Sequence, residues 1–147
     1  MPRIRKKSLS ELDLSTLHEF ELLPQEKETF LRGIALFNAG RFWEAHEAWE
    51  EIWLNHPEDG RFFIQALIQL AAGYHQLRRG IRRGFSIHLR RACDRLQLFP
   101  PDFLGVNAAE LYRIATDSLA RLENHSDDAE AVVQETVAPR IVMRKEP

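Results

Sequence analysis

The sequence contains little cysteine and no long apolar run, and both absences exclude classes of protein. Cys93 is the single cysteine among 147 residues, so neither an internal disulfide nor a CxxC metal site can form. No run of about 18 apolar residues occurs, so we expect no membrane-spanning segment. The basic start, residues 1–7, is followed by polar residues and scattered leucines, unlike a secretion signal. These features predict a cytoplasmic protein.

An excess of positive charge is also absent. Lysine and arginine together number 20 against 22 aspartates and glutamates, which gives a net charge of -2 and a pI near 6.3. Such a chain is not a polycation that binds nucleic acid by releasing counterions, so we expect no sequence-specific nucleic-acid binding. No serine nucleophile elbow, Walker loop or dinucleotide fingerprint occurs either. Three large enzyme classes therefore have no motif in this sequence.

Helical periodicity and turn-forming residues divide the chain into five expected helices. The third is apolar almost all round, so we expect it at the centre of the fold. Asn107 can cap the fifth helix with its side chain. Glycines and prolines separate the helices, because the former accept the left-handed conformation and the latter cannot continue a helix. The first helix is expected to open at Pro24 and to stop at Asn38-Ala39-Gly40, the next three to span about 41–55, 61–79 and 81–98, and the fifth to follow Asn107 with an apolar stripe that reaches Leu122.

This pattern predicts an all-α fold, a five-helix bundle of stacked antiparallel helical hairpins with extended or partly helical terminal arms. Two hairpins recur at a period of about 40 residues, because Gly40 and Gly80 hold the same place in each. They are tetratricopeptide-like, although the tetratricopeptide consensus is met loosely. We expect an N-terminal arm at 1–24, a bundle domain at 25–124 and a C-terminal tail at 125–147 that frays.

Two ordered motifs carry a family resemblance. They are Phe37-x-x-Gly40-x-Phe42-x-Glu44-Ala45-His46-Glu47-x-x-Glu50-x-x-Trp53 and Gln65-x-x-Ile68-x-x-Ala71-Ala72-x-x-His75, followed by Gly80. With this order and spacing, about residues 30–105 resemble an all-helical bacterial and archaeal family catalogued as domain of unknown function 309. The resemblance implies a small helical bundle and no established reaction. Gly84-Phe85 departs from the small residue that the family commonly has there, which bears on packing.

The tryptophan-rich stretch of the second helix needs a chemical explanation. At about 100° per residue, one helix face carries Phe42, His46, Trp49, Glu50 and Trp53. An ionisable pair on an apolar face must be hydrogen-bonded, metal-bound or shifted in pKa. We therefore expect His46 and Glu50 to be mostly buried and within hydrogen-bond reach of side chains from the third helix. The candidate ligand or polar cluster comprises His46, Glu50, Trp53, Gln65, Gln69 and His75.

Two interpretations of this cluster stay open. In the first, it is a satisfied polar contact, with an indole and a glutamine amide as partners, that fixes how two helices dock. In the second, it is a site whose candidate catalytic residues are His46, Glu47, Glu50 and His75 and whose candidate ligands for a divalent metal are His46, Glu50 and His75. The first is favoured, because the stretch lacks the second histidine of the zincin pattern and no Glu-x-x-His motif occurs.

Other unusual side chains have a structural interpretation beside a functional one. Three tryptophans, Trp43, Trp49 and Trp53, are expected in the core, with a stacking platform as the alternative. Cys93 is expected to be a buried, inert thiol. The arginines of the third and fourth helices are expected to form a solvated face. The alternative is an anion-binding site at the start of the fourth helix, built by Arg79, Arg82 and Arg83.

The function that these features favour is a non-catalytic interaction or scaffold domain that contains a buried His/Glu cluster and binds a protein partner. The alternative is a small metal-binding or hydrolase-like enzyme that uses His46, Glu50 and His75. The sequence identifies no cofactor, and a divalent metal is not favoured. It does not define an oligomeric state.

Overall fold

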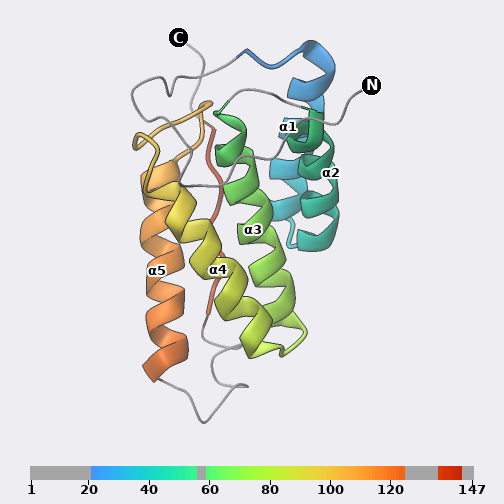
Figure 1. Ribbon diagram of the computed structural model, residues 1–147. Coiled ribbons are helices and arrows are strands. Elements are labelled where there is room, and N and C mark those ends of the chain that lie inside the picture. The colour runs from blue at the N-terminus through green and yellow to red at the C-terminus, as the bar shows by residue number, and fades with distance from the viewer. Residues whose placement is uncertain (1–20, 56–58, 125–135, 144–147) are drawn as a thin grey trace.

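In the residues that the structure describes, the chain folds into five α-helices, which confirms the expected all-α class. The structure, a computed structural model, describes residues 21–55, 59–124 and 136–143, and Figure 1 shows the arrangement of its helices. Each expected helix end lies within about two residues of the observed one, and the fourth helix differs most because it ends at Leu96. The helices are α1 (Pro24–Asn38), α2 (Phe42–Asn55), α3 (Arg61–Arg78), α4 (Arg82–Leu96) and α5 (Ala108–Asn124).

A glycine–tryptophan contact draws α1 and α2 together into a tight hairpin. Gly40 adopts a φ of +80°, the left-handed conformation that ends α1 and turns the chain back. The fully buried Trp49 donates its indole N–H to the carbonyl oxygen of Phe30 at 3.1 Å. A Cβ at Gly33 would lie 2.2 Å from that indole nitrogen. Glycine is therefore required where α2 crosses α1.

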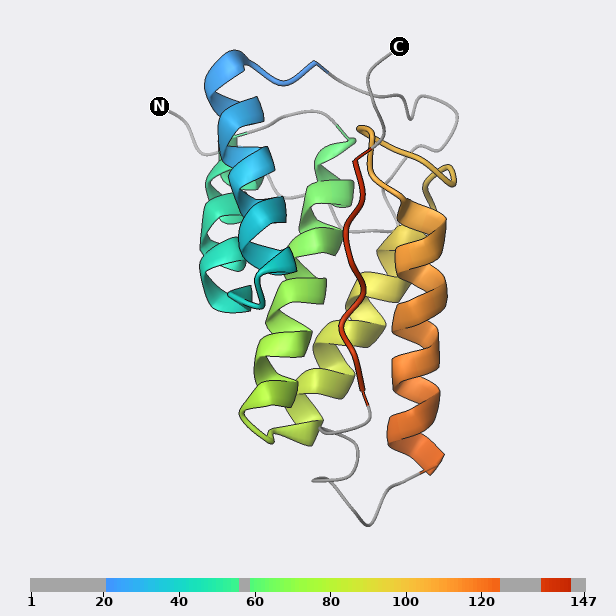
Figure 2. The same ribbon diagram turned by 180° about the vertical axis from the view of Figure 1, so that it is seen from behind.

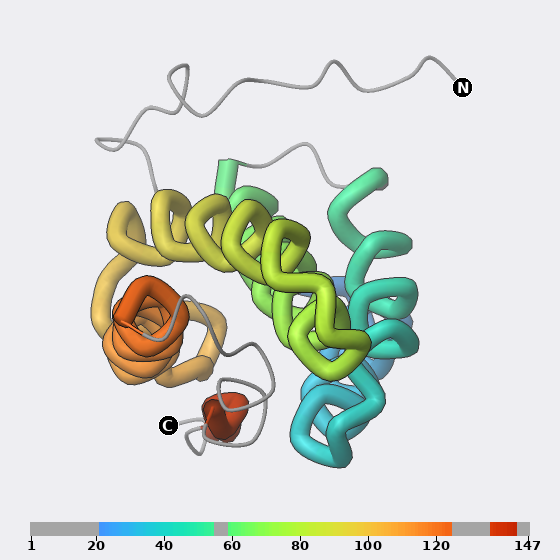
Figure 3. Tube along the Cα trace, turned by 90° about the horizontal axis from the view of Figure 1, so that it is seen from below, coloured from blue at the N-terminus to red at the C-terminus, as the bar shows by residue number. Residues whose placement is uncertain are grey.

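Helix α3 lies at the centre of the bundle, as its apolar sequence predicts. It packs against α2 on one side and α4 on the other, as Figures 1 and 3 show. Its large side chains are buried, Phe63, Leu67 and Leu70 completely. The hydroxyl of Tyr74 lies 2.9 Å from that of Ser118 and links α3 to α5. Within the described ranges, no helix is long and apolar enough to cross a membrane.

The C-terminal segment, residues 136–143, is part of the fold. Figure 2 shows it in red, running between α3 and α5 in the direction opposite to both. Its Ile141 is 2% exposed and belongs to the hydrophobic core. The expectation that the tail frays is therefore wrong for these residues, because a buried aliphatic side chain anchors them. Residues 125–135 and 144–147, and most of the expected N-terminal arm, lie outside the described residues.

Candidate functional site

His46 and Glu50 lie at the edge of the buried face of α2. The two side chains approach to 3.8 Å between Nε2 and Oε1, and they are 15% and 45% exposed. The expectation of mostly buried side chains thus holds for His46 and is wrong for Glu50. The reason is a rotated helix face, since the buried stripe of α2 is centred on Ala45, Trp49 and Ile52. A contact this open to water contributes little to stability.

His46 is held in an aromatic stack. The ring centroids of His46 and Trp43 lie 4.7 Å apart at an interplanar angle of 18°. On α3, the ring of His75 lies 5.2 Å from the same Trp43 ring at an angle of 39°. Burial lowers the pKa of His75, and the charges of Arg79 and His46 lower it further. Burial therefore favours neutral imidazole at His75. Trp43 is 49% exposed, so the expectation that it is a core residue is wrong.

The two glutamines of the expected cluster face α4 instead of α2. Arg95 donates from Nε to the Gln65 side-chain oxygen at 3.0 Å. His88 Nδ1 lies 2.7 Å from the Gln69 side-chain oxygen and donates to it. The expected glutamine partner for His46 or Glu50 is therefore engaged elsewhere. Helix α3 has a neighbour on each side, and the sequence pattern does not tell which of them each glutamine faces.

His88 is not among the expected site residues, although helical periodicity places it beside the buried face of α4. It follows the buried Phe85 by three residues and precedes the buried Leu89, which puts it at the margin of the apolar face of α4. Burial lowers the pKa of His88, with Arg91 and His46 acting in the same direction. His88 and His75 thus bring two imidazoles with lowered pKa to the surface that α2, α3 and α4 share.

The remaining candidates of this region do not assemble a metal centre. Glu47 is exposed on the outer side of α2, and Trp53 is partly buried and packs against the core. Among the residues that the structure describes, no three His, Cys, Asp or Glu side chains gather closely enough to hold a metal ion. His46 Nδ1 is buried and has no hydrogen-bond partner in that same part of the chain. The cluster therefore contains a buried ring nitrogen without a partner.

The arginines at the start of α4 share their surface with a carboxylate. Arg79 and Arg83 are exposed and Arg82 is half-buried. Arg82 and Arg83 line a shallow depression together with Glu123 of α5, whose carboxylate accepts a hydrogen bond from Arg90 at 3.1 Å. A negative charge inside the depression offsets its attraction for an anion.

Cys93 is buried, as the sequence analysis expected. Burial raises the pKa of its thiol to about 11, which disfavours a nucleophilic thiolate.

Two asparagines hold the C-terminal segment from opposite edges. Asn38 donates from Nδ2 to the Ile141 carbonyl oxygen and accepts the Ile141 N–H at Oδ1, both at 2.9 Å. Asn107 accepts the Val142 N–H at 2.9 Å and donates to the Arg140 carbonyl oxygen at 3.3 Å. Neighbouring residues of an extended chain present their main-chain groups to opposite sides. Each asparagine therefore pairs with one edge of the segment, as a neighbouring strand would.

We call the surface that receives this segment the docking groove, and define it by Asn38, Phe42, Tyr74, Leu77 and Asn107. The sequence analysis assigned Asn38 to a helix stop and Asn107 to a helix cap. Both side chains instead bond to residues that lie far along the chain, 103 and 35 positions away from Asn38 and Asn107. No local pattern marks such a contact. The composition around them, an asparagine at each helix end, is typical of ordinary turns.

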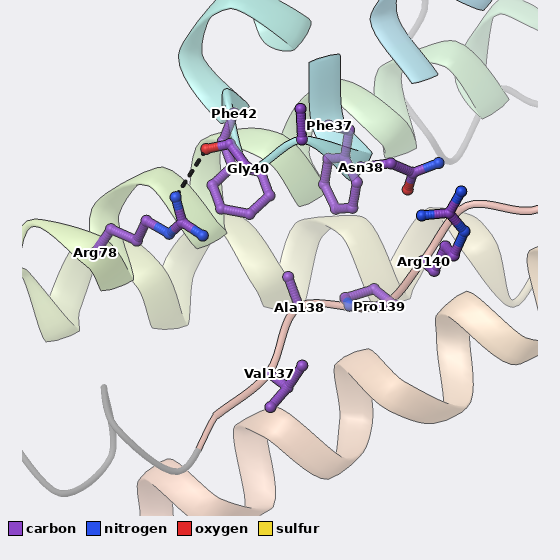
Figure 4. A pocket seen from close by; sticks show the side chains of 10 residues that line it. Phe37, Asn38, Gly40, Phe42, Arg78, Val137, Ala138, Pro139 and Arg140 are labelled. Atoms are coloured by element: carbon purple, nitrogen blue, oxygen red, sulfur yellow. Dashed lines mark hydrogen bonds between the residues drawn. The ribbon is translucent and has the colours of Figure 1, made fainter. Parts of the chain in front are cut away.

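The docking groove is incompletely filled beside the turn between α1 and α2. A cavity of about 240 Å³ lies between Phe37, Phe42 and Arg78 and the segment residues Ala138 and Arg140, as Figure 4 shows. A second cavity of about 260 Å³ adjoins Tyr74 and Leu77. Arg78 stands at the rim, donates to the Gly40 carbonyl oxygen at 2.9 Å and lies 4.8 Å above the Phe42 ring.

The fold and these contacts define the class, an all-α bundle of antiparallel helical hairpins. Within it, residues 30–87 match the family model described as Domain of unknown function (DUF309), which confirms the resemblance for that region. The match contains His46, Glu50, His75 and Asn38 and ends in α4, so Asn107 and the C-terminal segment lie outside it. No curated protein matches the chain. The family description carries no activity.

Proposed function

We propose that the chain is a non-catalytic helical module that binds a protein partner by receiving an extended segment of it in the docking groove. One observation carries the proposal, namely that the chain's own residues 136–143 lie there through four hydrogen bonds between asparagine side chains and the main chain of the segment. Hydrogen bonds to the main chain do not depend on the side chains of the segment, so segments of many sequences can form them. A buried side chain, here Ile141, then supplies specificity, as in peptide recognition by strand addition.

The proposal extends to two further features of the chain. We propose that the hairpins stack in a tetratricopeptide-like manner, which the repeated positions of Gly40 and Gly80 support, since both have positive φ and end the first helix of a hairpin. We also propose that the module acts in the cytoplasm. Cys93 supports this location, because its buried thiol is free and reducing compartments keep thiols in that form.

A second candidate function is a small metal-binding or hydrolase-like enzyme that uses His46, Glu50 and His75. The buried, unpartnered Nδ1 of His46 favours it, because buried ring nitrogens normally have a hydrogen-bond partner. The open position of Glu50 argues for the binding module instead. Stoichiometric zinc, iron or manganese in protein purified without a histidine tag would support the enzyme.

Binding in the groove can be tested in the full chain with a synthetic peptide. The peptide has the sequence of residues 134–145 and a fluorescent label, and fluorescence anisotropy measures its binding to wild type and to Ile141→Ser. Burial of an isoleucine side chain contributes about 1.5 to 3 kcal/mol, so the variant releases its own segment. We expect it to bind the peptide at least about tenfold more tightly than wild type, whose own segment competes.

Controls separate groove binding from loss of folding. Circular dichroism establishes that Ile141→Ser is helical, and Ile141→Ala provides a milder substitution at the same position. Adding Asn38→Ala to the Ile141→Ser chain should weaken peptide binding, while Asn124→Ala, an exposed asparagine at the end of α5, should leave it unchanged. If folded Ile141 variants bind the peptide no better than wild type does, the docking groove does not act on a second chain.

A further inference from the structure

We infer that the partner segment has a large apolar side chain at the position that Ala138 occupies in the chain's own segment; this inference rests on the proposed function. Ala138 lines both cavities of the docking groove, and in Figure 4 its methyl group points toward the Phe42 ring. A cavity of about 150 Å³ is enough to hold a benzene molecule. Each of the two spaces beside Ala138 is larger than that.

The lining of these spaces is suited to an aliphatic or aromatic group. Phe37, Phe42 and Tyr74 are 1%, 4% and 1% exposed, and their rings pack against one another with centroids 4.9 to 6.2 Å apart. Leu77, also buried, completes an apolar floor. The planar guanidinium of Arg78 at the rim can cover an aromatic ring as it covers Phe42. A polar side chain would find few partners on this floor.

The chain's own segment is an imperfect occupant of the docking groove. Thr136, which lines the second cavity, has a buried hydroxyl with no hydrogen-bond partner within the described residues. Buried polar atoms are normally satisfied. Next to it, Val137 is 77% exposed and contributes little burial. Residues 136–138 thus leave the two cavities unfilled and a hydroxyl without a partner, whereas Arg140, Ile141 and Val142 are held by the two asparagines.

A partner with a bulkier residue at this position therefore competes better with the chain's own segment. Replacing a methyl group by a leucine side chain adds three carbons, and full burial of three methylene equivalents corresponds to a gain of roughly 50-fold in affinity. With partial burial, we expect about a tenfold gain. The intramolecular segment has the advantage of high effective concentration, so the gain at position 138 gives a partner in solution the means to compete.

The inference is tested with labelled peptides of residues 134–145 that differ at one position, added to the full-length Ile141→Ser chain. The series is the parent sequence, Ala138→Leu and Ala138→Phe, with Val142→Leu as the matched control because Val142 is 48% exposed. We expect the two Ala138 peptides to bind about tenfold more tightly than the parent and the control peptide to bind as the parent does.

Each outcome has a distinct meaning. If the parent peptide binds and the Ala138 peptides bind equally or more weakly, this inference is overturned while the proposed function stands. If no peptide binds, the proposed function itself fails. Light scattering on the full chain carrying Ala138→Leu tests the other occupant: a stable dimer would assign the docking groove to a second copy of this chain and overturn the assignment to a different protein.

Discussion

Replacing Asn38 by alanine should detach the C-terminal segment while the helices stay folded. Asn38 makes two hydrogen bonds of 2.9 Å to the main chain of Ile141 in a partly buried place. Each such bond contributes about 0.5 to 1.5 kcal/mol, so removing both costs about 1 to 3 kcal/mol. The loss has an upper limit, because the segment can leave the docking groove and regain hydrogen bonds to water. That limit is the free energy of docking.

Urea unfolding and hydrogen exchange together test this prediction. We expect the unfolding free energy of Asn38→Ala to fall by about 1 to 3 kcal/mol, and the amides of Ile141 and Val142 to exchange fast at the same time. Asn107→Ala should cost less, because its two bonds are exposed and one is 3.3 Å long. The double variant should lose less than the sum, since detachment can happen once.

A matched variant and a clear negative result make the test decisive. Asn124→Ala removes an asparagine of the same size from the exposed end of α5 and should change stability by less than about 0.5 kcal/mol. Slow exchange of the Ile141 amide in Asn38→Ala, together with unchanged stability, would mean that the segment is held without the asparagine. The reasoning from paired main-chain bonds would then be refuted.

Three further predictions concern the helices. Gly33→Ala should destabilise by about 1 to 3 kcal/mol and shift tryptophan fluorescence, because Trp49 must move; an unchanged emission spectrum would contradict this. The folded pKa values of His75 and His88 lie below the ordinary 6.5, so their contribution to stability is complete above about pH 6.5 and falls as the unfolded chain takes up protons at lower pH. Melting temperatures at pH 7.5 and 5.5 should show this loss, reduced in His88→Gln. Glu50→Gln should change stability by less than about 0.5 kcal/mol, and thermal melts that a chelator lowers in wild type alone would favour the metal-binding alternative.

The positions of the helices followed from local signals in the sequence. Gly40 and Gly80 end α1 and α3 with positive φ, as expected from the one residue that adopts this conformation without strain. The all-round apolar pattern of α3 predicted its central place, because every face of such a helix needs a covering neighbour. Turn-forming residues and hydrophobic periodicity are properties of a few consecutive residues, so the sequence alone reveals them.

The candidate site depended on distances that no local pattern encodes. The face of α2 is rotated from the expected one, since burial is decided by where α1 and α3 lie, and this leaves Glu50 open while Trp49 is enclosed. Asn38 looks like an ordinary helix end in the sequence, yet it pairs with Ile141 at a separation of 103 residues. Local chemistry determined the helices, and the packing of distant segments decided which polar groups meet, because hydrogen bonds between side chain and main chain depend on spatial approach rather than on spacing along the chain.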